Sequence, residues 1–426
     1  MLQMVTVIDS IMGSRKTTWA FKYINDRPDL NFLYITPFLK QIERAKEEIN
    51  RYIAEPLHTD NNKFTNLKFL LRQGYDIATT HALFKYIDDE AMEIIRRKKY
   101  ILIMDEVFEP LVQLQIASDD IEDLLLKSEM IRKDDPKADV TYISWNEEHS
   151  DYNASFNYLK NLTKRKQVIC VNNDDGHEVL IWEYPPKIFE VFKEIYVLTY
   201  MFEASFLYYY FNIHSIDFLK KSIADGQIVN YYYQDPSKFA DIIKVYHGSM
   251  NINFPQNYYS LSKSWFGKKG NKKYINQLKK NLYNYFFNVH KNKAKYKMWS
   301  CHKKYKDDLT GKGYGLRFVP MNARATNSYQ DVKYLAYCIN VFMPSMLKTY
   351  LVKMGQQVDQ DAFALSTLLQ WIWRSRIRQP DNPSIHLYLP SVRMRSLLYR
   401  WLNVDSNLVL GLDAKYSQKS YKSHDE

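Results

Sequence analysis

The residues best suited to chemistry lie in a short loop near the start of this 426-residue chain. The β-branched run at residues 5–8 predicts a buried strand, and the apolar spacing at residues 19–24 predicts a helix. The candidates for nucleotide binding between them are Gly13, Ser14, Arg15, Lys16, Thr17 and Thr18. In a strand–loop–helix of this kind, backbone N–H groups and the positive helix N-terminus hold phosphate groups. The lysine reaches the β- and γ-phosphate oxygens, and the hydroxyl of Thr17 holds Mg²⁺.

The loop departs from the usual Gly-x-x-x-x-Gly-Lys-Ser/Thr pattern at two positions. Ser10 stands at the first glycine and Arg15 at the glycine before the lysine. Gly13 and Ser14 keep the loop small, but Arg15 adds a side chain where backbone normally passes close to phosphate. The loop alone therefore leaves two interpretations open, a working nucleotide site and an ordinary turn between a strand and a helix.

A pair of adjacent carboxylates forms the second chemical pattern. The apolar run at residues 100–104 predicts a fully buried strand that ends in Asp105 and Glu106. Open α/β sheets place their ligands at such carboxyl ends. Asp105 can bind Mg²⁺ through water, and Glu106 can orient an attacking water. An apolar run that ends in Asp-Glu also occurs by chance, so the upstream Lys16–Thr17 pair is what favours a site for ATP and Mg²⁺.

Polar side chains also follow other predicted strands. They are Thr36 and Pro37 after residues 31–35, Thr79, Thr80 and His81 after residues 76–78, and Thr199, Glu203 and Ser205 after residues 197–198. The first two sets can hold nucleic-acid phosphate at a strand end. A plain strand–helix junction explains Thr36 and Pro37 equally well, and a lone histidine such as His81 is more often structural.

Composition favours a basic, two-domain protein. The net charge of +11 and the pI of about 9.1 indicate a polyanionic partner, although a generally lysine-rich proteome would produce the same balance. Three cysteines without a Cys-x-x-Cys pair indicate neither a zinc site nor a disulfide framework. We find no basic leader and no long apolar run, so we expect a soluble protein of the cytoplasm with no membrane contact.

The first half contains more chain than one strand–helix unit needs. Residues 119–135 are acidic and polar, and residues 167–171 and 178–182 predict a β-hairpin around a polar turn. We interpret residues 115–190 as an insertion in the first domain, with no chemistry assigned to it. The second domain is expected from residue 215, with a strand at residues 227–233.

The second half carries a basic, aromatic-rich region at residues 263–306. Lysines can follow a phosphate backbone and aromatic rings can stack on bases, as in single-strand binders. Because Leu278, Leu282 and Tyr285 repeat at helical spacing, many of the aromatic side chains are expected in the core. A solvated basic face with some nucleic-acid contact accommodates both observations.

Two stretches near the C-terminus complete the set of candidates. A strand predicted at residues 317–320 leads into Arg324, Thr326 and Asn327, and another is predicted at residues 334–341. A helix is predicted over residues 364–378, stopped by Pro380. Its Gln370, Arg374 and Arg378 stand at i, i+4 and i+8, so they should line one helix face.

In this order the motifs resemble those of the superfamily 2 (DEAD/DEAH-like) helicases, and the style is closest to bacteriophage-encoded members. Lys16–Thr17 resembles the first motif and Asp105–Glu106 the Asp-Glu motif. The strand-end sets resemble the nucleic-acid motifs and, at residues 199–205, the coupling motif. Residues 323–327 resemble the fifth motif except for Ala325, where a glycine is usual. Residues 370–378 resemble the arginine-finger motif, although its second arginine would be expected at Ile377.

The resemblance implies an α/β fold with two tandem RecA-like domains, residues 1–214 and 215–426, and an ATP cleft between them. It implies an ATP- and Mg²⁺-dependent helicase or translocase that acts on nucleic acid. We expect DNA with a single-stranded portion, in phage replication, recombination or repair, alongside replication or recombination proteins in the host cytoplasm. Lys16, Asp105, Glu106, Gln370, Arg374 and Arg378 would be catalytic.

Two other functions stay open. The first is a nucleic-acid-binding protein of the same fold with a decayed ATPase, which Ser10 and Arg15 favour. The second is a DNA-packaging type of motor, since a Lys-Thr loop and an Asp-Glu pair serve those enzymes too. A packaging enzyme usually carries a carboxylate-rich nuclease domain after its motor. The basic second half and its arginine residues count against that alternative.

Overall fold

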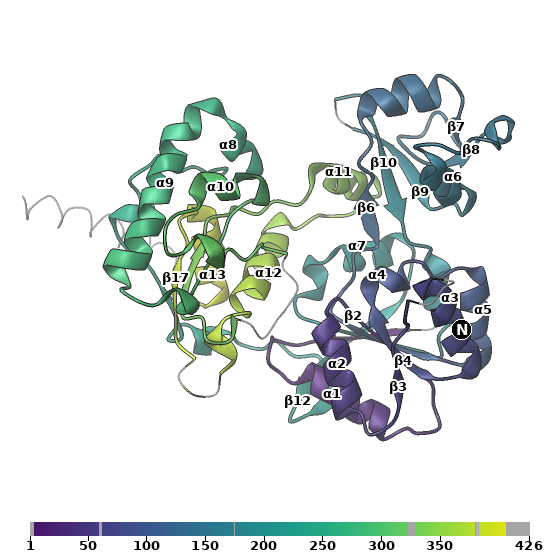
Figure 1. Cartoon of the computed structure of the whole chain (residues 1–426), viewed down its shortest axis with the longest axis horizontal. Coiled ribbons are helices and arrows are strands. Elements are labelled where there is room, and N and C mark those ends of the chain that lie inside the picture. The colour runs from purple at the N-terminus through teal and green to yellow at the C-terminus, as the bar shows by residue number, and fades with distance from the viewer. Residues whose placement is uncertain are drawn as a thin grey trace, which may run out of the picture. The chain divides into compact units, whose positions relative to one another are not determined.

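The chain forms two compact units in the computed structural model of the protein (Figure 1). The structure describes residues 4–58, 62–173, 175–322, 329–379, 381 and 383–405. The first unit comprises residues 1–232 and 343–359, and the second comprises residues 233–342 and 360–426.

An eight-stranded sheet forms the centre of the first unit, in the order β13-β12-β1-β11-β5-β2-β4-β3. Its strands are β1 (Val5–Asp9), β2 (Phe32–Thr36), β3 (Ile53–Ala54), β4 (Asp76–Thr80), β5 (Ile101–Asp105), β11 (Glu194–Thr199), β12 (Phe218–Ala224) and β13 (Gln227–Asn230). Every neighbouring pair is parallel except β12 and β13. The side chains of β5 are all buried, as expected of a strand covered on both faces.

Helices flank this sheet. They are α1 (Lys16–Asn25), α2 (Leu39–Glu48), α3 (Lys63–Gln73), α4 (His81–Phe84), α5 (Asp89–Lys98) and α7 (Phe206–Ile213). The first unit also contains α11 (Ser345–Lys353), which packs on an inserted second sheet. Trp19, Phe21 and Ile24 of α1 and Ile42 of α2 pack on one face of the sheet in a single apolar cluster. Local signals fix the helix ends: the Asp88 carboxylate accepts a hydrogen bond from the Ala91 N–H at the start of α5.

A second, five-stranded antiparallel sheet is inserted between β5 and β11, in the order β6-β10-β9-β8-β7. Its strands are β6 (Leu111–Gln113), β7 (Ile131–Lys133), β8 (Val140–Trp145), β9 (Val168–Asn172) and β10 (Glu178–Glu183). The predicted hairpin is confirmed as the β9–β10 pair. The π-helical segment η1 (Asp120–Leu126) and helix α6 (Asn157–Lys164) contribute Ile121, Leu125 and Leu159 to its core.

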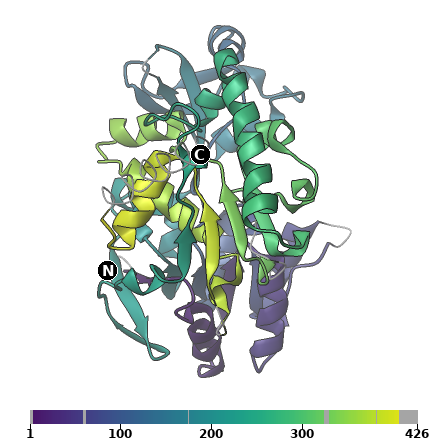
Figure 2. The same cartoon turned by 90° about the vertical axis from the view of Figure 1, so that its left-hand side faces the viewer.

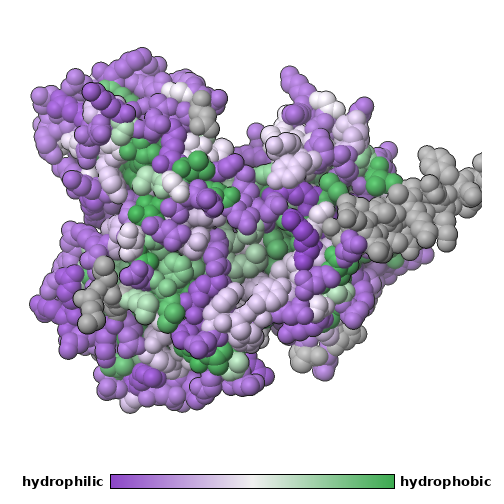
Figure 3. All heavy atoms as spheres, turned by 180° about the vertical axis from the view of Figure 1, so that it is seen from behind, coloured by the Kyte–Doolittle hydropathy of each residue, from purple (hydrophilic) through white to green (hydrophobic). Residues whose placement is uncertain are grey.

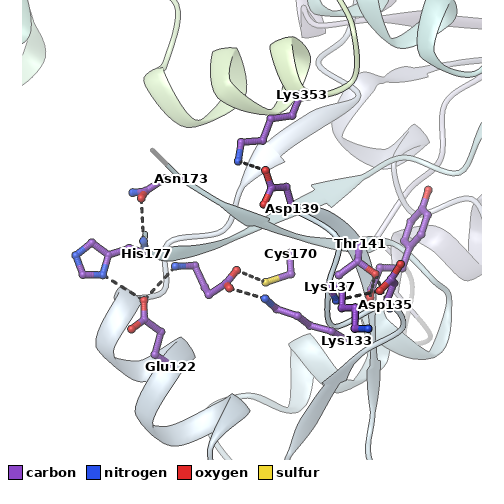
Figure 4. Close-up of polar contacts among 12 residues, drawn as sticks. Glu122, Lys133, Asp135, Lys137, Asp139, Thr141, Cys170, Asn173, His177 and Lys353 are labelled. Atoms are coloured by element: carbon purple, nitrogen blue, oxygen red, sulfur yellow. Dashed lines mark hydrogen bonds and ion pairs between the residues drawn. The ribbon is translucent and has the colours of Figure 1, made fainter. Parts of the chain in front are cut away.

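Helix α11 belongs to the first unit although it lies late in the sequence. The Tyr350 hydroxyl donates to Glu183 Oε1 at 3.0 Å. Lys353 Nζ lies 2.9 Å from Oδ2 of Asp139, just before β8 of the inserted sheet (Figure 4). Past the helix, the Asp359 N–H donates to the Tyr209 hydroxyl at 2.9 Å. The chain therefore leaves the second unit after residue 342, packs on the first, and returns at residue 360.

A four-stranded parallel sheet forms the centre of the second unit, in the order β14-β17-β16-β15. Its strands are β14 (Ile243–Val245), β15 (Lys297–Ser300), β16 (Tyr334–Tyr337) and β17 (Ile385–Tyr388). Its α-helices are α8 (Lys263–Gly267), α9 (Lys272–Asn284), α10 (Lys306–Leu309), α12 (Gln360–Ile372) and α13 (Val392–Trp401). Ile275, Leu278 and Leu282 of α9 share one apolar cluster with Trp299 and Tyr388 of the strands, and Figure 2 shows this helix running beside them.

The structure differs from the sequence expectations at several element boundaries. The first unit continues past residue 214, because β12 pairs with β1 and β13 pairs with β12. The expected strand at residues 317–320 is wrong: residues Gly315–Arg317 form a 3₁₀ turn, and Phe318 makes only an isolated bridge to Trp299. The helix expected to reach residue 378 ends at Ile372.

Surface properties agree with the basic, polar composition. Hydrophilic residues predominate on the face drawn in Figure 3, where hydrophobic residues form scattered patches. In the basic aromatic-rich region, Trp265, Phe266, Tyr285 and Phe286 are buried, so the expectation that many of its aromatic side chains form core is confirmed. Among the described residues, no helix is long and apolar enough to cross a membrane.

Candidate functional site

The loop between β1 and α1 is a compact turn. Gly13 has φ 85°, and Arg15, which precedes the first residue of α1, has φ 66° and ψ 28°. The Ser14 N–H donates to the Ile11 carbonyl at 3.2 Å, and the Trp19 N–H donates to the Arg15 carbonyl at 2.9 Å. Arg15 thus occupies, in the left-handed region, the position where a glycine is usual, and its side chain is exposed.

Ser10 has a structural use that explains why glycine is not needed at its position. Its hydroxyl accepts a hydrogen bond from the Ile223 N–H of β12 at 2.8 Å, and its own N–H donates to the Thr199 carbonyl at 3.0 Å. The residue is 1% exposed. The serine side chain is therefore engaged on the β12 side, where it links two parallel strands at the entrance of the loop.

Lys16, Thr17 and Ser14 offer groups suited to phosphate and Mg²⁺. Lys16 Nζ donates to the carbonyls of Ser10 at 2.5 Å and Ile11 at 3.2 Å, so its ammonium lies over the loop. The Thr17 hydroxyl lies 3.2 and 3.4 Å from the two carboxylate oxygens of Asp105. The Ser14 hydroxyl oxygen is buried and has no hydrogen-bond partner among the described residues. These donors fit a phosphate, and the hydroxyl–carboxylate pair fits Mg²⁺.

Asp105 is buried at the end of β5. The Tyr34 hydroxyl donates to its Oδ2 at 2.6 Å, in addition to the Thr17 contact. Burial raises the pKa of Asp105 above its usual value, and the hydrogen bonds from Tyr34 and Thr17 and the charge of Lys16 oppose that rise. A divalent cation beside Asp105 would favour the ionised carboxylate further.

Glu106 stands in an unusual backbone conformation directly after β5. Its φ is 68°, and its N–H donates to the Leu198 carbonyl of β11 at 2.9 Å. A left-handed non-glycine residue costs free energy, and such residues cluster at functional sites. The turn directs the chain away from the sheet immediately after the two carboxylates.

The predicted nucleic-acid residues of the first unit lie at the same edge of the sheet. Thr36 and Thr80 are register partners at the ends of β2 and β4. The Thr36 side chain has no exposed surface and its hydroxyl accepts from the Phe38 N–H at 3.3 Å, while the Thr80 hydroxyl accepts from the Leu83 N–H at 3.3 Å. Both therefore cap the turns that follow their strands.

Thr79 and His81, which flank Thr80, are buried as well. Thr79 is 1% exposed, and its hydroxyl has no hydrogen-bond partner among the described residues. The His81 ring contacts the Phe108 ring at a centroid distance of 6.3 Å. Pro37 is half-buried. A nucleic-acid strand that contacted this set would meet mainly backbone groups and the half-buried side chains of Thr80 and Pro37.

Asp9 is a polar residue of this site that the sequence patterns did not single out. It is 4% exposed, and its carboxylate accepts from the Met201 N–H at 2.8 Å and the Phe202 N–H at 3.0 Å. Burial raises the pKa of Asp9, against the lowering by the Phe202 N–H and by Lys220. The only signal in the sequence is its position as the last residue of an apolar strand, directly before the loop.

The predicted coupling residues follow β11 beside Asp9. Thr199 is buried and its carbonyl accepts from Ser10. Glu203 forms an ion pair with Lys220. The Ser205 hydroxyl caps α7 by accepting from the Tyr208 N–H at 3.2 Å. The structure thus brings Thr199 next to the loop and gives Glu203 and Ser205 local structural partners.

In the second unit, Gln370, Arg374 and Arg378 do not share one α-helical face, so that prediction is wrong. Helix α12 ends at Ile372, and the Ser375 hydroxyl accepts from the Ile377 N–H at the start of a 3₁₀ turn, η13 (Arg376–Arg378). Gln370 and Arg378 are exposed. Arg374 is half-buried and its Nη1 donates to the carbonyls of Met321 at 3.2 Å and Pro320 at 3.4 Å. The candidates Arg324, Thr326 and Asn327 lie outside the described residues.

A second polar cluster lies in the inserted sheet (Figure 4). Cys170 Sγ lies 3.0 Å from Glu178 Oε2, and Lys133 forms an ion pair with the other oxygen of the same carboxylate. Burial, together with Glu178, raises the pKa of the Cys170 thiol, so the thiolate is disfavoured. Among the described residues no group of three or more His, Cys, Asp or Glu side chains could hold a metal ion. We assign this cluster to the stability of the sheet.

Comparison with known proteins identifies relatives of the whole chain. The profile of the YonV middle domain matches residues 111–182, and that of the YonV C-terminal Rossmann-like domain matches residues 237–402. The SPbeta prophage-derived protein YonV of Bacillus subtilis (strain 168) is 37% identical over 421 residues, which cover 94% of this chain and 99% of the relative. This chain belongs to the YonV family. The YonV middle domain coincides with the five-stranded inserted sheet. The C-terminal domain covers most of the second unit and also residues 343–359, which pack with the first unit.

Solved helicase structures share the fold of this YonV-family chain. Xpd4 of S. tokodaii superposes with a TM-score of 0.53 at 11% identity, over 95% of each chain. An XPD helicase has a TM-score of 0.50 at 13% identity, over 94% of this chain and 95% of that one. An apo XPD structure has a TM-score of 0.50 at 12% identity, over 94% and 96%. The YonV-family chain therefore has the α/β fold of XPD-type helicases, with two RecA-like domains.

Proposed function

We propose that this protein is an ATP-dependent helicase or translocase that acts on DNA with a single-stranded portion, in phage replication, recombination or repair. The prophage origin of the relative and the helicase fold support the proposal. The observation that carries it is the Thr17 hydroxyl 3.2 Å from the buried Asp105 carboxylate, beside Lys16, at the carboxyl edge of a parallel sheet. Phosphoryl transfer from ATP needs these groups together.

Each residue of the loop edge has a role in the proposed reaction. Lys16 would exchange its two carbonyl contacts for the β- and γ-phosphate oxygens of ATP. Thr17 and Asp105 would hold Mg²⁺, which supplies neutralisation of phosphate charge. Glu106 would accept a hydrogen bond from the attacking water and orient it. Gly13, Ser14, Arg15 and Thr18 would offer backbone N–H groups and hydroxyls to the phosphates.

The remaining candidates have proposed roles outside the nucleotide-binding loop. We assign nucleic-acid contact to Thr36, Pro37, Thr79, Thr80, His81, Arg324, Thr326 and Asn327, and coupling to Thr199, Glu203 and Ser205. Arg374 and Arg378 of the second unit would stabilise transition-state charge, with Gln370 as a further catalytic residue. Replication or recombination proteins of a phage-infected host cytoplasm are the proposed partners.

ATP turnover with and without single-stranded DNA tests the proposal. Wild type should hydrolyse ATP faster when the DNA is present. Lys16→Ala should abolish turnover and weaken ATP binding, whereas Glu106→Gln should abolish turnover and keep ATP binding. Circular dichroism should be unchanged in both. Turnover by Glu106→Gln at the wild-type rate would show that the role given to the carboxylate pair is wrong.

A nucleic-acid-binding protein with a decayed ATPase is the second candidate. The observation that favours it is Arg15, a non-glycine residue at φ 66° in the loop. Such a protein would bind single-stranded DNA but show no ATP binding in calorimetric titration. Restoration of ATP binding by Arg15→Gly would favour this alternative.

A further inference from the structure

One row of side chains crosses the whole sheet of the second unit. Lys297 of β15 is the register partner of Tyr334 of β16, Tyr334 is the partner of His386 of β17, and His386 is the partner of Lys244 of β14. Register partners in parallel strands point to the same face of a sheet. We call these four residues the cationic row. It lies at the amino-terminal ends of β15, β16 and β17, on the face that carries the apolar core beneath α9.

Two further basic residues adjoin the cationic row. The His290 ring, which follows the π-helical segment η8 (Tyr285–Val289), lies 4.5 Å from the Tyr334 ring and 4.7 Å from the His386 ring, measured between centroids. Lys333 Nζ lies 5.9 Å from the centroid of the Tyr334 ring. His290, His386 and Lys333 are half-buried and Lys244 is exposed, so one end of the row is open to solvent.

Positive charge predominates at this place, and the carboxylate of Asp241 beside Lys244 is fully exposed. Burial, and after it the charges of His386, Lys333 and Lys297, together lower the pKa of His290 to about 4. Burial, then Lys333 and Lys244, also lower the pKa of His386. Lys244 lies 3.9 Å from the exposed carboxylate of Asp241. Each of the charged groups that act on the two imidazoles is therefore a cation or becomes one on protonation.

The excess of positive charge is energetically unfavourable at Lys297, because this side chain is buried. It is 1% exposed, its Nζ lies 4.0 Å from the Phe287 ring centroid, and burial lowers its pKa. Among the residues that the structure describes, no carboxylate forms an ion pair with Lys297 or Lys333. Buried cations without a counter-charge are rare because desolvation penalises them. An anion bound beside the row would remove much of that penalty.

We propose that the cationic row, with His290 and Lys333, binds the phosphate backbone of single-stranded nucleic acid. Lys297 and Tyr334 are buried, so the part of this site open to solvent runs from Lys244 of β14 to Lys333, directly before β16. It crosses two gaps between strands, roughly 10 Å, which offers contacts to more than one phosphate of a strand. Open α/β sheets usually bind ligands at their carboxyl ends, so this contact is separate from the candidates of the first unit. The inference rests on the proposed nucleic-acid function and adds a contact to it.

The salt dependence of oligonucleotide binding tests the row. We would measure fluorescence anisotropy of a labelled single-stranded oligonucleotide over a range of KCl concentrations. Each lost phosphate contact should lower the slope of log K against log salt by about 0.7. The double variant Lys244→Gln/Lys333→Gln should therefore lose about 1.4, and His386→Gln should lower the affinity. Lys238→Gln, at an exposed lysine of the same unit outside the row, should keep the wild-type slope.

Three results would overturn the inference. One is a wild-type slope and affinity in the row variants while wild type binds the oligonucleotide. Another uses inorganic phosphate as the probe at constant ionic strength: phosphate binding lost in the row variants, with oligonucleotide binding unchanged, would assign the row to small phosphates. The last is absence of oligonucleotide binding by wild type, which would also remove the proposed function. Unchanged circular dichroism and basal ATP turnover would confirm that the variants fold.

Discussion

Replacement of Arg15 by glycine should stabilise the first unit. Its φ of 66° and ψ of 28° place Arg15 in the left-handed region, which costs an L-residue roughly 1–2 kcal/mol. Glycine adopts this conformation freely but adds about 0.5–1 kcal/mol of unfolded-chain entropy. The difference is a net gain of about 0.5–1 kcal/mol in the free energy of unfolding. Urea unfolding of the variant and wild type would measure it.

Two matched variants separate the backbone effect from the loss of a positive charge. Lys99 has φ 54° and is exposed at the end of α5, so Lys99→Gly should give a similar gain. Lys22 lies in the interior of α1 and is exposed, so Lys22→Gly should lose about 1 kcal/mol. A gain in the free energy of unfolding for Arg15→Gly and Lys99→Gly, together with a loss for Lys22→Gly, would show that the backbone conformation causes the effect. A loss of stability in Arg15→Gly alongside a gain in Lys99→Gly would refute the reasoning, because it would mean that the Arg15 side chain stabilises the loop.

The same variants connect the loop backbone to nucleotide chemistry. If the Arg15 side chain lies away from phosphate, Arg15→Gly should turn over ATP at a similar or higher rate. Lys99→Gly should leave turnover unchanged, because α5 is not part of the loop. A fall of tenfold or more in ATP affinity for Arg15→Gly alone would show that the guanidinium itself contributes to phosphate binding.

Arg374→Ala should reduce ATP turnover by a factor on the order of a thousand with little change in ATP binding, as for an arginine finger, and Arg378→Ala should cost the same or less. Steady-state hydrolysis and nucleotide titration of both variants would test this. If the variants lose only DNA affinity and keep their turnover, the segment with Arg374 and Arg378 is a nucleic-acid-binding surface. Burial raises the pKa of Asp76 to about 6, so the folded protein holds this proton more tightly than the unfolded chain. Asp76 should therefore contribute up to about 3 kcal/mol to the free energy of unfolding. This contribution should be present below about pH 4 and lost as the pH rises through 6. Urea midpoints of Asp76→Asn should lack this slope. Lys353→Glu should lower the free energy of unfolding, because it removes the ion pair that holds α11 to the inserted sheet. Addition of Asp139→Lys should restore the ion pair with reversed charges, with a coupling energy of about 0.5 kcal/mol in a double-mutant cycle.

Local sequence patterns were sufficient to predict an element wherever its structure depends only on its own residues. The apolar run before Asp105 gave a strand buried on both faces. The hairpin of β9 and β10 followed from its turn composition. The loop at Lys16 was placed correctly between a strand and a helix. In each case the signal and the structure lie within about ten residues of each other.

Features that depend on distant partners were missed. The β12 segment contains two consecutive lysines and has no apolar run, yet its pairing with β1 makes it part of the first sheet. The period that predicts a helix continues past Ile372, but the Ser375 hydroxyl caps a new turn instead. Asp9 owes its role to backbone N–H groups almost two hundred residues away. No local pattern contains that information.

Asp9 also explains how a change at the phosphate loop could reach the rest of the first unit. The end of β11 is hydrogen-bonded on one side to the loop, through Ser10 N–H to the Thr199 carbonyl, and on the other to Glu106 N–H through the Leu198 carbonyl. Asp9 then fixes the turn after Thr199 by accepting two backbone N–H groups. These hydrogen bonds connect the loop, Glu106 and the turn to the same end of β11. Under the proposed function, movement of Lys16 toward a phosphate would act at a strand end that also contacts Glu106 and residues 199–205, and coupling of hydrolysis to movement along a strand would use this connection.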